Sequence, residues 1–169
     1  MPMTPLLGQR LADALNCSMP TRKMVNDIWT KATVKLAPST IPPSAEMITV
    51  PVFAQHNTTV RGQRDANGTP LGALVGGDKK DVIISTYIYS NLQSGVPKPV
   101  VIYGWHQLNG SAIQPRYNGH EETYADYSHG IRLVDNTIVV NGDAKTVAEI
   151  LAQQRAAEKA DALIRDMPL

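Results

Sequence analysis

Three short apolar runs in the middle of the chain constrain its fold more than any other feature. Residues 71–75, 82–89 and 100–105 are rich in β-branched and aromatic residues and are bounded by glycine, proline and asparagine, which is typical of β-strands. Residues 131–140 add two more short runs around a turn predicted at Asp135-Asn136. Because the connections are too short for several helical crossovers, we expect a mixed or partly antiparallel sheet of about five strands.

Two helices are predicted before this sheet. Thr4-Pro5 provides a capping residue and a first helical position, and the helix that follows is expected to end near Asn16. Thr21 opens a second amphipathic helix, whose end is predicted at Pro38. The pair is expected to form a helical hairpin.

Two further helices are expected later in the chain. Ser44 offers a cap for a third helix that runs toward Arg61, with a kink or an interruption at Pro51. From Asp143 onward, apolar residues recur at helical spacing among charged and polar ones, which predicts a long C-terminal helix. Its mostly polar far end could pair with a partner.

Together these patterns predict a single α+β domain. A length of 169 residues fits one domain with a buried core. The helices should cover one face of the sheet, and the site should lie on the other face or at the edge. The predicted parts are a helical part over residues 1–61, a sheet part that carries the site over residues 62–141, and a C-terminal helix over residues 142–169.

Charge and composition argue against several classes of function. The 16 basic and 15 acidic residues are mixed along the chain, which lacks the basic patch expected of a nucleic-acid-binding protein. No apolar run approaches the roughly 20 residues of a membrane helix, so we expect no membrane insertion. No signal peptide is recognised, so a cytoplasmic location is the default expectation, with export open by another route or after removal of a signal.

One polar segment is expected to line a functional site. Residues 117–134 hold two of the four histidines, three of the six tyrosines and several acids. His106 precedes this segment at the end of a predicted buried strand, where sheets commonly present site residues. Ionisable and aromatic groups that recur within roughly thirty residues favour a shared site over separate structural histidines.

Nucleophilic catalysis is the first chemistry that these residues could support. His129 or His106 would act as general base, oriented by Asp126 through the other ring nitrogen. Cys17, the only cysteine, would be the nucleophile if the next helix lowered its pKa, although a lone cysteine also serves as a small buried apolar residue. Ser128 is the alternative nucleophile.

A metal centre is the second chemistry. His106, His120 and His129 with a carboxylate would suit zinc or another divalent ion that keeps an open position for water. Their spacing matches no ligand signature such as His-Glu-x-x-His. Catalysis with and without a metal therefore both stay open.

Substrate-binding residues are expected around these histidines. Arg132 and the Lys79-Lys80-Asp81 turn carry charges that could hold a carboxylate or a phosphate of a substrate. The candidates are Arg132, Lys80, Gln114, Trp105 and Tyr124.

A non-enzymatic function stays open beside catalysis. Aromatic side chains are favoured at binding surfaces, so a sugar- or peptide-binding module is an alternative, with the last helix mediating assembly of a homo-oligomer. This hypothesis predicts exposed rings on one face and no charge-paired histidine. The rings concerned are those of Tyr103, Trp105, Tyr117, Tyr124 and Tyr127.

Most of the chain resembles a family of uncharacterised bacterial proteins. The similarity covers residues 4–134 and implies that the chain is one unit, without implying an activity. It lies in the motifs Met-Pro-Thr-Arg-Lys-Met-Val-Asn-Asp-Ile-Trp, Gly-Gly-Asp-Lys-Lys-Asp-Val-Ile-Ile-Ser, Ile-Tyr-Gly-Trp-His and Asp-Tyr-Ser-His-Gly-Ile-Arg-Leu-Val.

Two shorter resemblances concern cell-wall enzymes. Residues 128–133 are similar to the Ser-His-Gly-Cys-Ile-Arg-Leu signature of L,D-transpeptidases, but the cysteine is absent here, which excludes that thioester route. Papain-like cell-wall amidases place a cysteine early and a histidine later, and Cys17 with His106 or His129 follows the same order. With the candidate residues above, these resemblances favour a hydrolase of amide or peptide bonds as the enzymatic hypothesis, with peptidoglycan as one candidate substrate and Arg132 expected to bind a substrate carboxylate.

Overall fold

The chain folds into a mixed α+β structure, as predicted. The computed structural model describes residues 2–165. Its helices are α1 (Pro5–Ala14), α2 (Arg22–Lys31), η1 (Ala45–Ile48), α3 (Val50–Ala66), η2 (Thr86–Asn91) and α4 (Val147–Arg165), of which η1 and η2 are short 3-10 helices. Its strands are β1 (Cys17–Ser18), β2 (Val34–Leu36), β3 (Val75–Gly77), β4 (Lys80–Ile83), β5 (Pro99–His106), β6 (Ala112–Glu121), β7 (His129–Gly130), β8 (Val134–Asp135), β9 (Thr137–Val140) and β10 (Asp143–Thr146).

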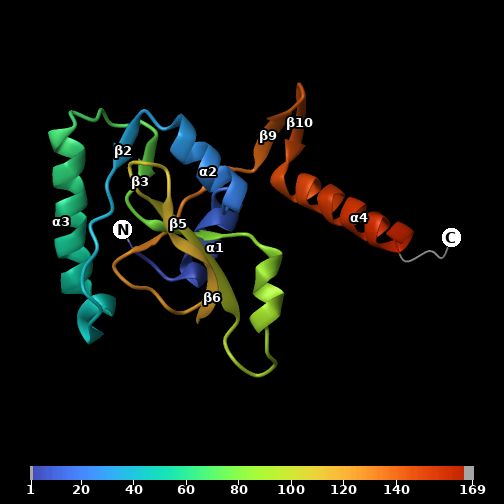
Figure 1. Cartoon of the computed structure of the whole chain (residues 1–169), viewed down its shortest axis with the longest axis horizontal. Helices are drawn as coiled ribbons and strands as arrows, with labels where there is room; N and C mark the ends of the chain where they lie inside the picture. Colours follow the sequence, from blue (N-terminus) through green and yellow to red (C-terminus); the bar gives the residue numbers. More distant parts are fainter. Residues whose placement is uncertain (1, 166–169) are drawn as a thin grey trace.

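The largest sheet in the described part of the chain has four strands in the order β6-β5-β4-β7. Its two long strands, β5 and β6, lie side by side in Figure 1. β5 is antiparallel to both β4 and β6, whereas β7 runs parallel to β4. Three separate two-stranded sheets accompany it: β1 with β8, β2 with β3, and β9 with β10. The sequence predicted the partly antiparallel pairing, but a single sheet of about five strands is not what forms.

Strand predictions failed where other local interactions compete. The run over residues 82–89 leaves the sheet at Ile83, because Ser85 caps the start of η2 through a 3.2 Å bond from the Tyr87 amide. The ten-residue strand β6 was not predicted. It is an edge strand with mostly exposed residues, including Pro115 and Gly119, so it carries none of the apolar signal of a buried strand.

Two helix boundaries also differ from the prediction. α2 ends at Lys31 rather than at Pro38, because residues 34–36 leave as β2 and pair in parallel with β3. Pro51 lies in the first turn of α3, where proline is tolerated, so it begins this helix instead of interrupting it. The third helix then continues to Ala66, beyond the expected end at Arg61.

A hairpin precedes the C-terminal helix. Asn141 and Gly142 have φ values of 54° and 94° and form the turn between β9 and β10, as Asn-Gly does in tight hairpins. The predicted helix start at Asp143 was therefore wrong. α4 begins after Thr146, whose hydroxyl accepts a bond from the Glu149 amide at 3.2 Å. Residues 166–169 of the predicted helix lie outside the described residues.

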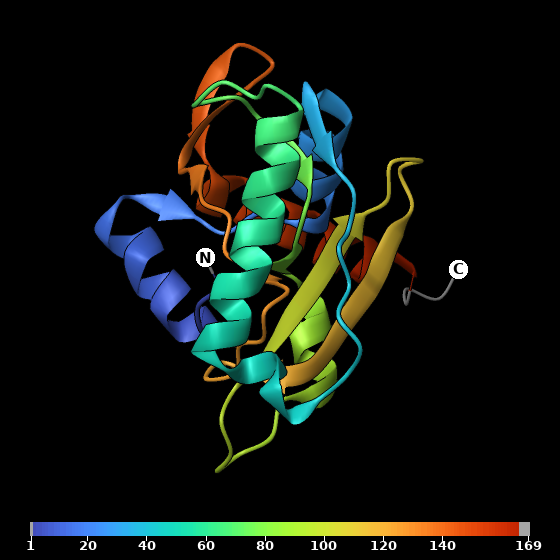
Figure 2. The same ribbon diagram turned by 90° about the vertical axis from the view of Figure 1, so that its left-hand side faces the viewer.

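Helices pack on both sides of β5, and not on one face of the sheet as predicted (Figures 1 and 2). On one side, Val25 of α2 packs with Ile83 and Val101. On the other side, His56 of α3 meets the ring of Trp105 at 6.5 Å between centroids. A second apolar cluster joins Met19, Val82 and Ile102.

A backbone irregularity decides where the end of β5 points. Gly104 and Trp105 have φ values of 109° and 54°, both far from extended geometry, and the register with β6 shifts next to them. The side chains of His106 and Tyr103 therefore both contact the Oδ1 atom of Asn26 in α2, whereas the ring of Trp105 lies against His56 of α3. Regular alternation along the strand would have placed these two side chains differently.

Candidate functional site

His120, Asp126 and His129 come together beside the central sheet. Their potential ligand atoms all lie within 4.8 Å of one another, and among the side chains that the structure describes, those of residues 2–156, no other group of three histidines, cysteines or acids is arranged in this way. His120 is near the end of β6, His129 opens β7, and Asp126 lies in the turn between them. Strand β7 pairs with Lys80 of β4, which brings this turn against the sheet.

His129 is fully buried, with a relative exposure of 0%. Neither of its ring nitrogens has a hydrogen-bond partner. Burial lowers the pKa of His129 to about 4, so the ring is neutral at physiological pH. Buried polar atoms are nearly always paired in folded proteins, so the lone pair of this neutral ring is available to a ligand or a water molecule.

Asp126 supplies a buried carboxylate. One of its oxygens accepts bonds from the Ser128 amide at 2.8 Å and the Ser128 hydroxyl at 2.6 Å. The other accepts bonds from the Lys80 ammonium at 3.1 Å and the Tyr124 hydroxyl at 3.4 Å. Burial alone would raise the pKa of Asp126, but the Ser128 bonds and the nearby positive charge outweigh it, so the net direction is downward and the group is ionised.

His120 completes the group from the edge strand. Its ring stacks on Tyr124 with the centroids 4.2 Å apart and meets His129 at 5.2 Å. Burial lowers the pKa of His120, and the Lys80 ammonium lowers it further. The group therefore combines two neutral imidazoles with one ionised carboxylate.

Two pockets border this group. His129 lines a pocket of about 430 Å³ that extends toward α3 and the turn between β3 and β4. His120 and Tyr124 line a second pocket of about 260 Å³ beside the loop that follows η2. Of the two histidines, only His120 is partly exposed, whereas the ring nitrogens of His129 are buried.

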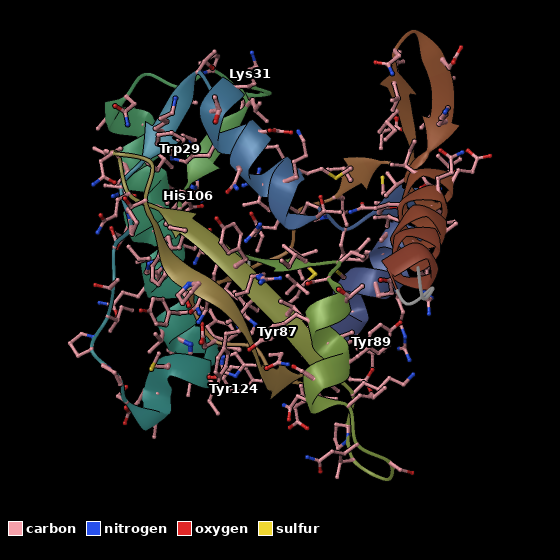
Figure 3. All side chains as sticks on the ribbon, turned by 45° about the vertical axis from the view of Figure 1, so that its right-hand side comes forward. Trp29, Lys31, Tyr87, Tyr89, His106 and Tyr124 are labelled. Carbon is pink, nitrogen blue, oxygen red and sulfur yellow. The ribbon has the colours of Figure 1, made fainter. Side chains whose placement is uncertain are left out.

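His106 does not join the group. Its Nε2 atom lies 3.1 Å from Asn26, and its ring stacks on Trp29 at 5.8 Å. Figure 3 shows His106 beside Trp29, well separated from Tyr124. The metal set predicted from the sequence therefore keeps His120 and His129, and replaces His106 with Asp126.

The predicted nucleophiles are not activated by a histidine. The Cys17 thiol donates to the Leu15 carbonyl at 3.5 Å and makes no hydrogen bond to a histidine in the described structure. Cys17 lies in β1, paired with Asp135 of β8. The Ser128 hydroxyl donates to Asp126. The arrangement that nucleophilic catalysis requires is absent from these two residues.

The predicted substrate-binding residues separate into different environments. Lys80 is buried and forms an ion pair with Asp126, so its ammonium is not available to a substrate. Arg132 lines the larger pocket, where it donates to Asp81 at 3.3 Å and to the Val75 carbonyl at 3.4 Å. Gln114 lies on β6 and donates to the Pro115 carbonyl. Of the three, only Arg132 faces a pocket.

The aromatic residues do not form one exposed face. Trp105 and Tyr127 are buried, with 6% and 2% exposure, whereas Tyr117 is 45% exposed. Tyr103 and Tyr124 are half-buried. Figure 3 places two other exposed rings, Tyr87 and Tyr89, on η2. The surface that the binding-module hypothesis requires is therefore not assembled by the five predicted residues.

His56 and Lys79 form a second polar pair that the sequence did not reveal. The Nε2 atom of His56 lies 2.8 Å from the Ser39 carbonyl and must donate to it, so Nδ1 accepts from the Lys79 ammonium at 2.7 Å. Lys79 also donates to the Tyr127 carbonyl. His56 is the buried residue of an otherwise exposed or half-buried helix, and nothing in its neighbouring residues signalled this role.

The chain was compared with known protein families, proteins and structures. No protein-family model, curated protein or solved structure matches the chain. None of the described helices is both long and apolar enough to span a membrane.

Proposed function

We propose that the protein is a divalent-metal hydrolase of amide or peptide bonds, with the ion held by His120, Asp126 and His129. The observation that carries this proposal is the pair of unpaired ring nitrogens on fully buried His129, with ligand atoms of the other two residues within 4.8 Å. Two imidazoles and a carboxylate are a ligand set of catalytic zinc sites.

The charge states of the three side chains support the same proposal. Metal ligands must be neutral imidazoles and ionised carboxylates. Burial lowers the pKa of both His120 and His129. The pKa of Asp126 is lowered by its hydrogen bonds from Ser128 and by nearby positive charge. At neutral pH no proton has to leave these groups before an ion binds.

A general-base mechanism without a metal fits the geometry less well. In that mechanism Asp126 would orient His129 through a hydrogen bond to a ring nitrogen. Both ring nitrogens lack a partner, and the carboxylate oxygens are occupied by Ser128, Lys80 and Tyr124. The close approach of His120, Asp126 and His129 supports the metal proposal, whereas no carboxylate orients His129 through a hydrogen bond.

Each group of the site has a defined role in this proposal. A bound divalent ion supplies a Lewis acid that lowers the pKa of water and polarises a carbonyl. Tyr124 and Lys80, which both donate to Asp126, would hold this carboxylate in position as a ligand of the ion. The resemblance to cell-wall enzymes makes cell-wall peptides the first substrates to assay.

The test is hydrolysis of a panel of peptides and cell-wall fragments, followed by mass spectrometry, before and after metal removal with a chelator. We expect cleavage that is lost with the metal, restored by zinc or another divalent ion, and reduced at least roughly 100-fold in His120→Ala and His129→Ala. His106→Ala and Cys17→Ala serve as matched controls and should retain activity. Cleavage that survives metal removal but disappears in Cys17→Ala would contradict the proposal.

A further inference from the structure

The larger pocket beside His129 has a lining of mixed charge. Its volume is about 430 Å³, and its walls come from α3, the turn between β3 and β4, and the segment that follows β7. Two acids and two bases line it: Asp78, Asp81, Lys79 and Arg132. A pocket of this size accommodates a small ligand.

Asp78, one of the lining residues, carries an unpaired acceptor. Its Oδ1 atom is buried and has no hydrogen-bond partner. The backbone at Asp78 has a φ of 64°, a left-handed conformation that Asp and Asn adopt more readily than most residues. An N–H donor from a ligand would satisfy this oxygen, as buried carboxylate oxygens generally require.

The two bases retain unused donors. A lysine ammonium has three N–H bonds, and Lys79 uses two of them, to His56 and to the Tyr127 carbonyl. An arginine has five N–H donors, and Arg132 makes bonds from Nε to Asp81 and from Nη1 to the Val75 carbonyl. Both cations can therefore donate to an anionic group without losing their present partners.

We infer that this pocket binds the zwitterionic head of an α-amino acid, with its ammonium at Asp78 and its carboxylate at Lys79 and Arg132. A zwitterion leaves the balance of two acids and two bases unchanged, whereas a ligand with a single charge would disturb it. The ammonium of the ligand would donate to the unpaired oxygen of Asp78. Its carboxylate would accept from the unused N–H donors of Lys79 and Arg132.

The class of substrate can be inferred further, and this step rests on the proposed hydrolase function. His129 lines the same pocket, so the head group would lie next to the bond that is cleaved. An amino acid whose α-ammonium and α-carboxylate are both free can carry that bond only in its side chain. The proposed substrates are therefore side-chain amides of amino acids, including side-chain-linked peptides.

Binding of glutamine, measured by calorimetry and by protein-observed NMR, tests the inference. The probes are L- and D-glutamine, N-acetylglutamine, which lacks the ammonium, and 4-aminobutanamide, which lacks the carboxylate. We expect one glutamine enantiomer to bind at least about tenfold more tightly than both singly charged probes. Asp78→Asn, which keeps the left-handed backbone, should remove the preference over N-acetylglutamine and keep the preference over 4-aminobutanamide. The control Asp65→Asn changes an exposed acid paired with Arg64 and should leave binding unchanged.

The same titration in His120→Ala separates this inference from the proposed function. His120 is a proposed metal ligand and does not line the larger pocket. Glutamine binding retained in this variant, with hydrolysis lost, supports both proposals. Glutamine binding in the wild type without metal-dependent hydrolysis would leave the pocket inference standing and overturn the hydrolase. Absence of saturable binding at millimolar glutamine, or equal binding of all probes, would overturn the pocket inference.

Discussion

Lys80 has opposite effects on the fold and on the proposed metal site. Its ammonium lies 3.1 Å from Asp126, and their side chains are 9% and 2% exposed. Without a bound cation, the buried carboxylate depends on this partner. With a divalent ion on the carboxylate, the same ammonium is a nearby like charge that weakens binding of the ion.

Replacement of Lys80 separates these effects. In Lys80→Met we expect the unfolding free energy of the metal-free protein to fall by about 3 kcal/mol, since a buried charge loses its partner. We expect zinc affinity to rise at the same time, because the like charge is gone. Urea unfolding and zinc titration measure the two effects. In the control Lys23→Met, which breaks an exposed pair with Asp27, stability should change by less than about 1 kcal/mol. Unchanged stability, or weaker zinc binding, in Lys80→Met would contradict this interpretation.

Asp81 makes stability depend on pH in the direction opposite to most acids. Burial raises its pKa from 3.8 to about 6, although Arg132 opposes this shift. The folded state therefore holds the proton more strongly than the unfolded state. The stabilising contribution is complete below pH 3.8 and is lost as the pH rises through about 6.

The variant Asp81→Asn isolates this effect. Between pH 4 and pH 6, the wild type should lose about 2 kcal/mol relative to the variant, because a shift of one pKa unit corresponds to roughly 1.4 kcal/mol and this range covers most of the titration. Urea unfolding of both proteins across this range measures the difference. A difference that stays constant with pH would show that Asp81 titrates normally.

At the scale of the elements, the turn between β3 and β4 positions both Asp78 and Lys79. Gly77 ends β3 with a φ of 87°, and a Cβ atom there would lie 2.2 Å from the Leu36 carbonyl oxygen of β2. Only glycine allows β2 to approach this closely. The position of the larger pocket's charged residues therefore depends on this contact.

A matched pair of glycines tests this contact. Gly72 has a similar φ of 85°, but a Cβ atom there would meet nothing within 4 Å. Gly72→Ala should cost about 1–2 kcal/mol from backbone strain alone. Gly77→Ala should destabilise the protein clearly more and shift the NMR signals of Asp78 and Lys79. Equal destabilisation in the two variants would show that the approach to Leu36 is unimportant.

Local patterns predicted some elements and missed others for identifiable reasons. Thr4 and Thr21 accept the capping bonds expected of them, and the predicted strand over residues 100–105 forms within β5. The exposed edge strand β6 has no apolar pattern to detect. By contrast, the Asn141-Gly142 turn and the Thr146–Glu149 capping box were present in the sequence as local signals, and they place the start of α4 after β10.

At the scale of the whole molecule, three residues that the sequence singled out lie together, whereas His106 lies elsewhere. His120, Asp126 and His129 were candidates because they cluster along the chain, and β6 and β7 bring them together in space. The left-handed backbone at Trp105 turns His106 away from this group, and no residue pattern predicts that backbone conformation. His56 reaches the site region only because α3 packs against Trp105 and Tyr127.

Titration of zinc into the metal-free protein by calorimetry tests the central claim most directly. We expect one ion per chain in the wild type and in His106→Gln, and a loss of at least about tenfold in affinity in His120→Gln and His129→Gln. The glutamine variants keep a polar side chain, and circular dichroism checks that they fold. Zinc binding that is lost in His106→Gln but retained in His129→Gln, or no zinc binding by the wild type, would contradict a metal centre at His120, Asp126 and His129.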